Sequence, residues 1–559
     1  MLLHISDTNG ENNLLEWMLS GLQNTDICPG TASLHPAADE AQISLCRLSG
    51  TTCDFCTERN LQCIVSQEAD FPEDGYEPIV PRRIHALTHK SRLLPPLDLC
   101  EELINLYFRY IHVSFHVLFH KPSFLAAFKN GSLSRILLFA VIGMSARFSQ
   151  HESLIKASPR ERGRPFTKEA ERLLNLHDIS LTTIQACLLL GASAVVEGEG
   201  ATESVYFSIA CRMGMLLDLP NAPVTTRIQQ ELNFRVWWAL YETDTWSSTG
   251  VRLPKMMPLR NVPLPMAEKR FLELSSTAPP NRTYIANRGS PTAKSPIPQD
   301  SLIAHSVMVN QIFSQIDEVN SRAVSGELHG AELTQAVERV SVELNSWACS
   351  LPDRMVNTPE NLVYWTRQGF GNIFVVLHMD YCHLCQILFY QFLHGSANQA
   401  YHHEDQDQHQ LRSQYAQKCR KYSTDVCNLI HLASETEGAE LLNSIVGHVL
   451  TIASTVQLHI LLFSDDAADV HSARRLLERN FELLTRLKTF WPCIDISFAR
   501  FEAFHKACLR CQDDSHFQMD QWMLKFMLEF AAPLTERYEE EGGGEENFQR
   551  PWSLISTAI

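Results

Sequence analysis

From Leu97 to about Tyr538, apolar residues recur at spacings of three and four in one segment after another. Examples are "LSRILLFAVIGMSARF", "ESVYFSIACRMGMLLDL" and "LLNSIVGHVLTIASTVQLHILLF". This period places apolar side chains on one face of an α-helix, and several segments are apolar most of the way round, as in deeply buried helices. Strand-like alternation bounded by turn residues is hardly visible, so the sequence predicts an all-α fold.

The formal net charge of −17 limits how the chain could meet nucleic acid. A chain this acidic has no overall attraction for phosphate backbones, so any nucleic-acid binding has to come from a small local patch. The length of 559 residues suggests about three or four domain-sized units, although large helical domains can merge. No apolar run reaches the length of a membrane span and no secretory signal is visible, so we expect an intracellular protein without a membrane partner.

Four of the sixteen cysteines lie within the stretch "LCRLSGTTCDFCTERNLQC". Cys46, Cys53, Cys56 and Cys63 are separated by six, two and six residues, in a polar segment without apolar periodicity. Zinc takes four soft ligands in a tetrahedron, and closely spaced thiolates supply them. Because cysteines in an intracellular chain do not suggest disulfides, the cluster predicts a zinc site.

The stretch "TTCDFCTERNLQCIV" resembles the second half of the fungal binuclear zinc-cluster DNA-binding domain. That family carries six cysteines and two zinc ions that share two thiolates. The resemblance implies that Cys46, Cys53, Cys56 and Cys63 correspond to its third to sixth cysteines. The places of its first two cysteines fall near Pro36 and three residues later, and neither holds a cysteine.

The segment that would read DNA carries the wrong charge. Where the family has a basic helix this chain has "EAQISL", and Met1–Val80 holds thirteen acidic residues against two bases, Arg47 and Arg59, a formal charge of −11. Phosphate affinity comes from cations, and base recognition requires Arg or Lys on base edges. We therefore expect a truncated, degenerate zinc-cluster module with impaired DNA binding, in which Arg47 and Arg59 are weak DNA-contacting candidates.

The helical region resembles a second part of the same family, the fungal-specific transcription factor regulatory domain, over about residues 97–540. The residues that fit its opening pattern are Tyr107, Phe108, His112, Phe115 and Phe124. The residues that fit its tryptophan signature are Arg235, Trp237, Trp238, Asp244, Ser248, Gly250 and Pro254. The family usually has Gly-Arg-Pro at the turn that follows, whereas this chain has "GVRLP".

The two resemblances together imply a nuclear transcription regulator that acts on RNA polymerase II promoters. They imply zinc as the cofactor and DNA with CGG-type triplets as the family's partner. They also imply the transcription machinery, a small-molecule effector and a second copy of the chain as further partners. An alternative stays open, namely a helical regulatory or effector-binding protein derived from the family that does not contact DNA. No nucleotide-binding loop or nucleophile elbow supports an enzyme, so we predict none.

Composition shifts divide the chain into segments. Proline-punctuated, serine-rich and acidic glycine-rich stretches interrupt the helical pattern and predict a linker, a loop and a tail. We expect an atypical N-terminal segment at 1–45, the partial zinc-cluster module at 46–65, a linker at 66–96, the regulatory domain at 97–270, a flexible loop at 271–300, the C-terminal helical part of the regulatory region at 301–540 and a disordered tail at 541–559.

We expect the residues of the tryptophan signature to have structural roles. Paired tryptophans on a helix bury a large area, so we expect Trp237 and Trp238 to be core residues that join neighbouring helices. Arg235 and Asp244 are nine residues apart on what could be a single helix. We expect structural charges with separate partners, not a catalytic dyad.

Cysteines in the helical region have a simple interpretation. The pair Cys382 and Cys385, with His378 and His383 nearby, could hold a metal, but its helical context favours core packing. The singly placed cysteines are expected to be small buried residues, and they are Cys100, Cys187, Cys211, Cys349, Cys427 and Cys493.

Overall fold

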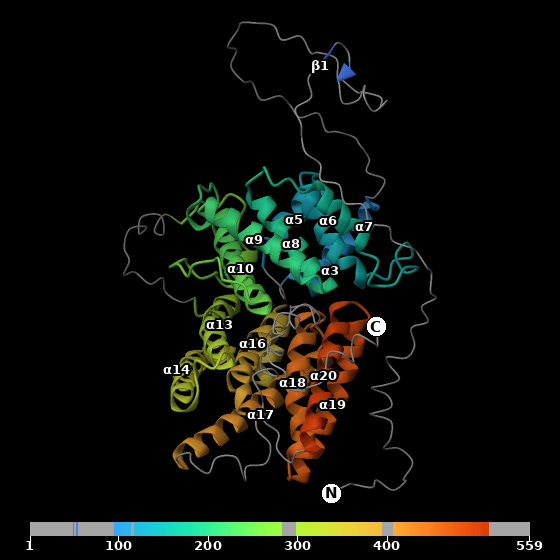
Figure 1. Cartoon of the computed structure of the whole chain (residues 1–559). Coiled ribbons are helices and arrows are strands. Elements are labelled where there is room, and N and C mark those ends of the chain that lie inside the picture. Colours follow the sequence, from blue (N-terminus) through green and yellow to red (C-terminus); the bar gives the residue numbers. More distant parts are fainter. Residues whose placement is uncertain are drawn as a thin grey trace. The chain divides into compact units, whose positions relative to one another are not determined.

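The structure is a computed structural model that describes residues 48–49, 52–53, 94–112, 117–281, 298–393 and 406–513. The chain divides into two units, Met1–Ser91 and Arg92–Ile559. In the first unit, the described residues form the strands β1 (Leu48–Ser49) and β2 (Thr52–Cys53), an antiparallel pair in which Leu48 lies opposite Cys53. The described elements of the second unit are all helices (Figure 1), so the all-α prediction is confirmed.

The first part of the second unit, up to Leu272, consists of α-helices with short 3-10 turns between some of them. In chain order they are α3 (Leu97–Tyr110), α5 (Lys121–Lys129), α6 (Arg135–Ser145), η1 (Ala146–Phe148), α7 (Arg164–Leu173), α8 (Leu181–Glu197), α9 (Gly200–Leu216), η2 (Leu219–Asn221), α10 (Arg227–Val251) and α11 (Glu268–Leu272).

The second part contains longer helices. In chain order they are α13 (Leu302–Val324), α14 (Gly330–Cys349), η3 (Asp353–Met355), α15 (Pro359–Arg367), α16 (Gly371–Phe389), η4 (Tyr390–Phe392), α17 (Gln406–Glu435), α18 (Ile445–Phe463), α19 (Ala467–Lys488) and α20 (Cys493–Asp513). The helices α16 to α20 lie alongside one another as a bundle (Figure 1). The helix expected near residues 521–538 and the segments 1–45 and 541–559 lie outside the described residues.

Helix α10 shows why the local sequence folds as it does. Thr226 precedes the helix, and its hydroxyl accepts a hydrogen bond from the Gln229 backbone N–H at 3.2 Å. The Gln229 side chain bonds the Thr226 backbone N–H in return, which completes a capping box. The helix ends at Arg252, which adopts a left-handed conformation with φ +60°. These signals define a 25-residue helix in the second unit.

Close contact between α8 and α9 depends on glycine. A Cβ atom at Gly191 would collide with the ring of Phe207, so the absence of a side chain lets the two helices approach each other. Helix α8 then ends at Gly198, whose φ of +80° is a conformation that favours glycine. This hairpin of helices forms one wall of the core against which α10 packs.

Two helices correct the expectation that no apolar run is long enough to span a membrane. Gly371–Phe392 and Ile445–Phe463 are long and apolar enough to span a membrane, with mean hydropathies of 1.4 and 1.7. The apolar windows of the two helices are 83% and 78% buried inside the structure. Both helices therefore pack as core helices of the bundle, where an apolar surface on every side meets other helices.

Arg147 holds the two halves of the second unit together. Its guanidinium is 2% exposed, donates to the Phe490 carbonyl at 2.8 Å and lies 4.3 Å from the centroid of the Trp491 ring. Arg160, in the segment between η1 and α7, donates to the Lys488 carbonyl at 2.8 Å. These contacts satisfy carbonyls at the end of α19, which have no partner within that helix, and fasten it to the turn after α6.

Candidate functional site

The cysteines predicted to bind zinc fall almost entirely outside the described residues. This is true of Cys46, Cys56 and Cys63, and of the DNA-contacting candidates Arg47 and Arg59. The backbone of Cys53 is described, at the end of β2. The ligand set of the zinc site and the two arginine contacts therefore stay predictions.

The second cysteine pair is part of the core, as predicted. Cys382 and Cys385 lie on α16 and are 5% and 2% exposed. Burial raises the pKa of Cys385 to about 12, so its thiol is protonated at neutral pH. His378 contacts the Met355 carbonyl at 2.8 Å instead of a thiol. Within the described ranges, no group of three or more His, Cys, Asp or Glu side chains could hold a metal ion.

Among the single cysteines, the expectation of burial is wrong at one position. Cys349 is exposed, because it is the last residue of α14, where the helix leaves the core. Cys493 is of intermediate exposure at the start of α20, and the other four are buried as expected.

The residues of the tryptophan signature are structural, and they have separate partners. Arg235 bonds Glu231 on the same helix at 2.9 Å and the Met266 carbonyl at 2.6 Å. Asp244 accepts the backbone N–H groups of Met256 and Met257, both at 2.7 Å, and so holds the turn after α10. The prediction that Arg235 and Asp244 have separate structural partners is therefore confirmed.

The two tryptophans are core residues, as predicted. Trp237 is 0% exposed and Trp238 is 3% exposed. The indole of Trp238 donates to the Pro263 carbonyl at 2.9 Å, which ties the irregular segment before α11 to the helix. Tyr107, Phe108, His112 and Phe124 of the opening pattern are also buried, whereas Phe115 lies outside the described residues.

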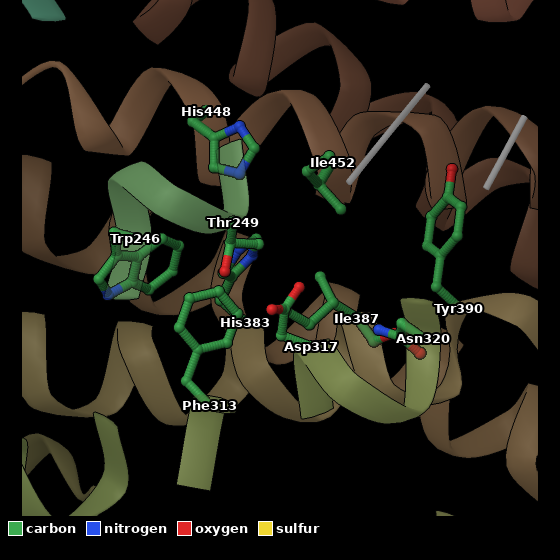
Figure 2. A pocket seen from close by; sticks show the side chains of 10 residues that line it. All are labelled: Trp246, Thr249, Phe313, Asp317, Asn320, His383, Ile387, Tyr390, His448 and Ile452. Carbon is green, nitrogen blue, oxygen red and sulfur yellow. The ribbon is translucent and has the colours of Figure 1, made fainter. Parts of the chain in front are cut away.

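A cavity of about 20 Å³ lies where α10, α13, α16 and α18 meet, and sequence analysis did not single it out. A space of this size has room for about one water molecule. Figure 2 shows the residues that line it, which are Trp246, Thr249, Phe313, Asp317, Asn320, His383, Ile387, Tyr390, His448 and Ile452. They come from positions up to 206 residues apart, so no local motif could have predicted the cavity.

Three polar side chains of the cavity each have an atom without a hydrogen-bond partner among the described residues. Thr249 is 4% and His383 1% exposed, and neither Thr249 Oγ1 nor His383 Nδ1 has a partner in the part of the chain that the structure describes. Asp317 Oδ2 lies 3.7 Å from Lys255 Nζ, whereas its buried Oδ1 meets no donor among the described residues. Burial lowers the pKa of His383 to about 4, so its imidazole is neutral at physiological pH.

A pair of acids lies one helical turn from the cavity. Glu242 precedes Trp246 by four residues on α10, and Asp380 precedes His383 by three on α16. Burial raises the pKa of Glu242 to about 8, with a further contribution from the charge of Asp380, and burial raises the pKa of Asp380 to about 7. Neither acid was singled out from the sequence, although a charged residue within an apolar helix such as "NIFVVLHMDYCHLC" is a signal that could have found Asp380.

Asn310 of α13 connects this pair to the aromatic wall. Its amide donates to Asp380 Oδ2 at 3.3 Å and its carbonyl oxygen accepts from Trp246 Nε1 at 3.0 Å. The rings of Trp246 and Phe313 lie 4.3 Å apart between centroids. Acids, an amide and two aromatic rings from three helices therefore form one packed group beside the cavity.

Comparison with known proteins shows which proteins the helical region resembles. Residues 104–348 match the family described as the fungal specific transcription factor domain. The match spans the opening pattern, the tryptophan signature and α13, and so includes the α10 and α13 sides of the cavity.

Relatives from three fungi carry names of the same kind. A transcriptional regulatory protein of Schizosaccharomyces pombe is 22% identical over 76% of this chain and 54% of its own length. The Zn(2)-C6 fungal-type transcription factor FTF1c of Fusarium oxysporum f. sp. lycopersici is 24% identical over 81% of this chain and 52% of its own length. The Fusaric acid cluster transcription factor FUB12 of Gibberella moniliformis is 25% identical over 47% of this chain and 38% of its own length. The chain thus spans about half the length of the first two relatives and less of the third.

Proposed function

We propose that this protein is a fungal transcription regulator of the zinc-cluster family, and that its second unit is the regulatory region. The observation that carries the proposal is the match of residues 104–348 to the fungal specific transcription factor domain. The relatives that cover most of the chain are named as transcriptional regulators, which supports the same assignment. On this proposal the protein works in the nucleus, at RNA polymerase II promoters, and contacts the transcription machinery.

The proposed role of the helical region is regulatory, not catalytic. The residues of its signature are engaged with backbone and core partners, as Arg235 and Asp244 illustrate. A buried residue whose hydrogen bonds hold helices in place contributes to stability and to the shape of the domain. The proposal also includes the segment map, with 66–96 as linker and 271–300 as a flexible loop between 97–270 and 301–540.

For the first unit we propose one zinc ion and weak DNA binding. Cys46, Cys53, Cys56 and Cys63 are a chemically suitable set of soft ligands. The formal charge of −11 over Met1–Val80, from thirteen acids and two bases, opposes contact with phosphates. We infer that CGG-type triplets are bound no better than a scrambled duplex.

Zinc content tests the metal site directly. The purified full chain should contain about one zinc by elemental analysis, and Cys53→Ser should lower that content. Cys349→Ser is the matched control because Cys349 is a single exposed cysteine in the second unit, and it should leave the content unchanged. Two tightly bound zinc ions per chain, or an equal effect of both variants, would contradict the proposed ligands.

DNA binding is tested by a mobility shift of labelled duplexes. The unmodified chain should not distinguish the triplet duplex from the scrambled one at moderate salt. A chimera whose residues 1–45 are replaced by the basic first half of a complete zinc-cluster domain should bind the triplets in a salt-sensitive way. Selective binding by the unmodified chain would overturn the proposed impairment, and a chimera that holds two zinc ions but ignores the triplets would overturn the assignment of Cys46.

The acidic first unit favours a second candidate function, a regulator derived from the family that acts through partners without contacting DNA. Tethering the full chain to a heterologous DNA-binding module in a fungal cell separates regulation from DNA contact. A change in reporter output supports a regulatory region in either case. Unchanged output, with the fusion shown to be present in the nucleus, would contradict the proposed function of the helical unit.

A further inference from the structure

The cavity at the junction of α10, α13 and α16 is surrounded by atoms that accept hydrogen bonds. Thr249 Oγ1, Asp317 Oδ1 and His383 Nδ1 belong to lining residues and have no partner within the described ranges. A neutral imidazole nitrogen, a hydroxyl oxygen and carboxyl oxygens can all accept a hydrogen bond from a ligand. Three unused acceptors in one lining therefore call for an occupant that is rich in donors, because a buried polar atom without a partner is destabilising.

The charges around the cavity point to the same kind of occupant. Asp317 of α13 lines the cavity, and Glu242 of α10 and Asp380 of α16 lie about one helical turn from lining residues of their own helices. In the part of the chain that the structure covers, an ion-pair contact is present for Asp317 alone, with Lys255 at 3.7 Å. The two histidines of the lining have pKa values lowered by burial and are uncharged at neutral pH, so they add no positive charge. The lining residues thus include one carboxylate and no Lys or Arg.

The aromatic wall suits a cation as well. Trp246 and Phe313 lie against each other on one side of the cavity, and Figure 2 shows the Asp317 carboxylate beside them. The faces of aromatic rings attract ammonium groups, most strongly where water is excluded. The Trp246 indole N–H is already bonded to Asn310, which fixes the ring in this position.

We propose that the cavity binds the ammonium group of a small amine, with Asp317, Thr249 and His383 as acceptors and the rings of Trp246 and Phe313 as the wall. A volume of about 20 Å³ fits an ammonium group, which is about as large as a water molecule, and excludes a bulky metabolite. That this amine is the effector of the regulator is a second step, which rests on the proposed function.

Methylammonium is the probe for the site, with methanol as a neutral ligand of similar size. Ligand-observed NMR on the purified full chain should show saturable binding of methylammonium with a Kd on the order of 10 mM, close to the tightest expected for a ligand of two heavy atoms. Methanol should bind at least tenfold more weakly. Tetramethylammonium, which carries charge but no N–H donor and is too large, should not compete.

Two variants locate the binding. Asp317→Asn removes one carboxylate charge and Thr249→Val replaces a hydroxyl by a methyl group of similar size, and each should weaken methylammonium binding by about tenfold. Glu318→Gln is the matched control, because Glu318 is the next residue of α13 and its side chain is 69% exposed. It should leave the Kd within twofold of the unmodified protein. Circular dichroism of each variant confirms that the helical fold is retained.

Three results would overturn the proposal. They are no saturable binding of methylammonium, equal binding of methanol, and equal binding by the Asp317, Thr249 and Glu318 variants. None of these bears on the proposed function, because the measurement needs no DNA or promoter. Conversely, a reporter that does not respond to the tethered chain would contradict the regulatory function and leave the binding result intact.

Discussion

Replacing Asp244 by alanine should release the turn after α10 and destabilise the second unit by about 2–4 kcal/mol. The Asp244 carboxylate accepts the N–H groups of Met256 and Met257, each at 2.7 Å, and the Ser248 hydroxyl at 3.4 Å. A hydrogen bond to a charged group contributes about 1.5–3 kcal/mol, so the two short bonds contribute about 3–6 kcal/mol together. Removing a carboxylate that is 6% exposed also relieves its burial, which offsets part of that loss.

The assay is urea unfolding of the full chain followed by circular dichroism, with limited proteolysis as a local probe. A chain of this size need not unfold in one step, so the midpoint of the first transition is compared between variants. Asp244→Ala should lower that midpoint and make the peptide bond after Lys255 newly accessible to trypsin. Asp244→Asn keeps an acceptor oxygen without the charge, so its urea midpoint should lie between those of the unmodified protein and Asp244→Ala.

Asp469→Ala is the control for this experiment. Asp469 is exposed in the first turn of α19, where removing a favourable charge at a helix start costs about 0.3–1 kcal/mol. If Asp244→Ala unfolds at the same urea concentration as Asp469→Ala, the carboxylate does not hold the turn and the reasoning is wrong. The same conclusion follows if Asp244→Asn is less stable than Asp244→Ala.

Three further outcomes are expected. Arg147→Met should destabilise the second unit by about 2–4 kcal/mol and make α19 and α20 sensitive to protease before the other helices, since buried carbonyls lose their donor; simultaneous digestion of all helices would speak against this coupling. Because the pKa of Glu242 is raised, the folded state of the unmodified protein loses stability as pH rises from about 4.5 through about 8. In thermal unfolding between pH 6 and 8, Glu242→Gln should therefore be more stable than the unmodified protein by about 1–2 kcal/mol. Glu318→Gln should show no such trend. Gly191→Ala should destabilise the protein by about 1–3 kcal/mol because the new methyl group meets the Phe207 ring, and a thermal midpoint equal to that of the unmodified chain would refute the close approach of α8 and α9.

The sequence predicts the helices and their buried signature residues because those properties are local. The spacing of apolar residues places Trp237 and Trp238 on a helix, and their size then requires burial. The separation of Arg235 from Asp244 correctly predicts separate partners. The identity of those partners could not be read from the sequence, since Met266 and Met257 lie in irregular segments without a periodic pattern.

The cavity and the acid pair are properties of the tertiary structure. Trp246 of α10 and Ile452 of α18 line the same space together with residues of α13 and α16, and nothing near either residue in the chain specifies that meeting. Cys349 illustrates the opposite error, because a residue type that is usually buried stands at the end of a helix where solvent begins. The apolar length of helices α16 and α18 is hard to see in the sequence, because buried polar residues such as His378 and Gln457 interrupt the apolar runs.

The contact of Arg147 with Phe490 has a practical consequence for experiments that map regions by deletion. The match to the transcription factor domain ends at residue 348, but the Arg147 guanidinium within it is covered by Phe490 and Trp491, more than 300 positions later in the chain than Arg147. Ile496 likewise packs against Gly198, at the end of α8. A fragment that stops at the end of the match would leave apolar helix faces and a buried guanidinium in water. Differences in reporter output across such a deletion series would measure the turnover of damaged protein, so point variants are the sound way to locate regulatory residues in this chain.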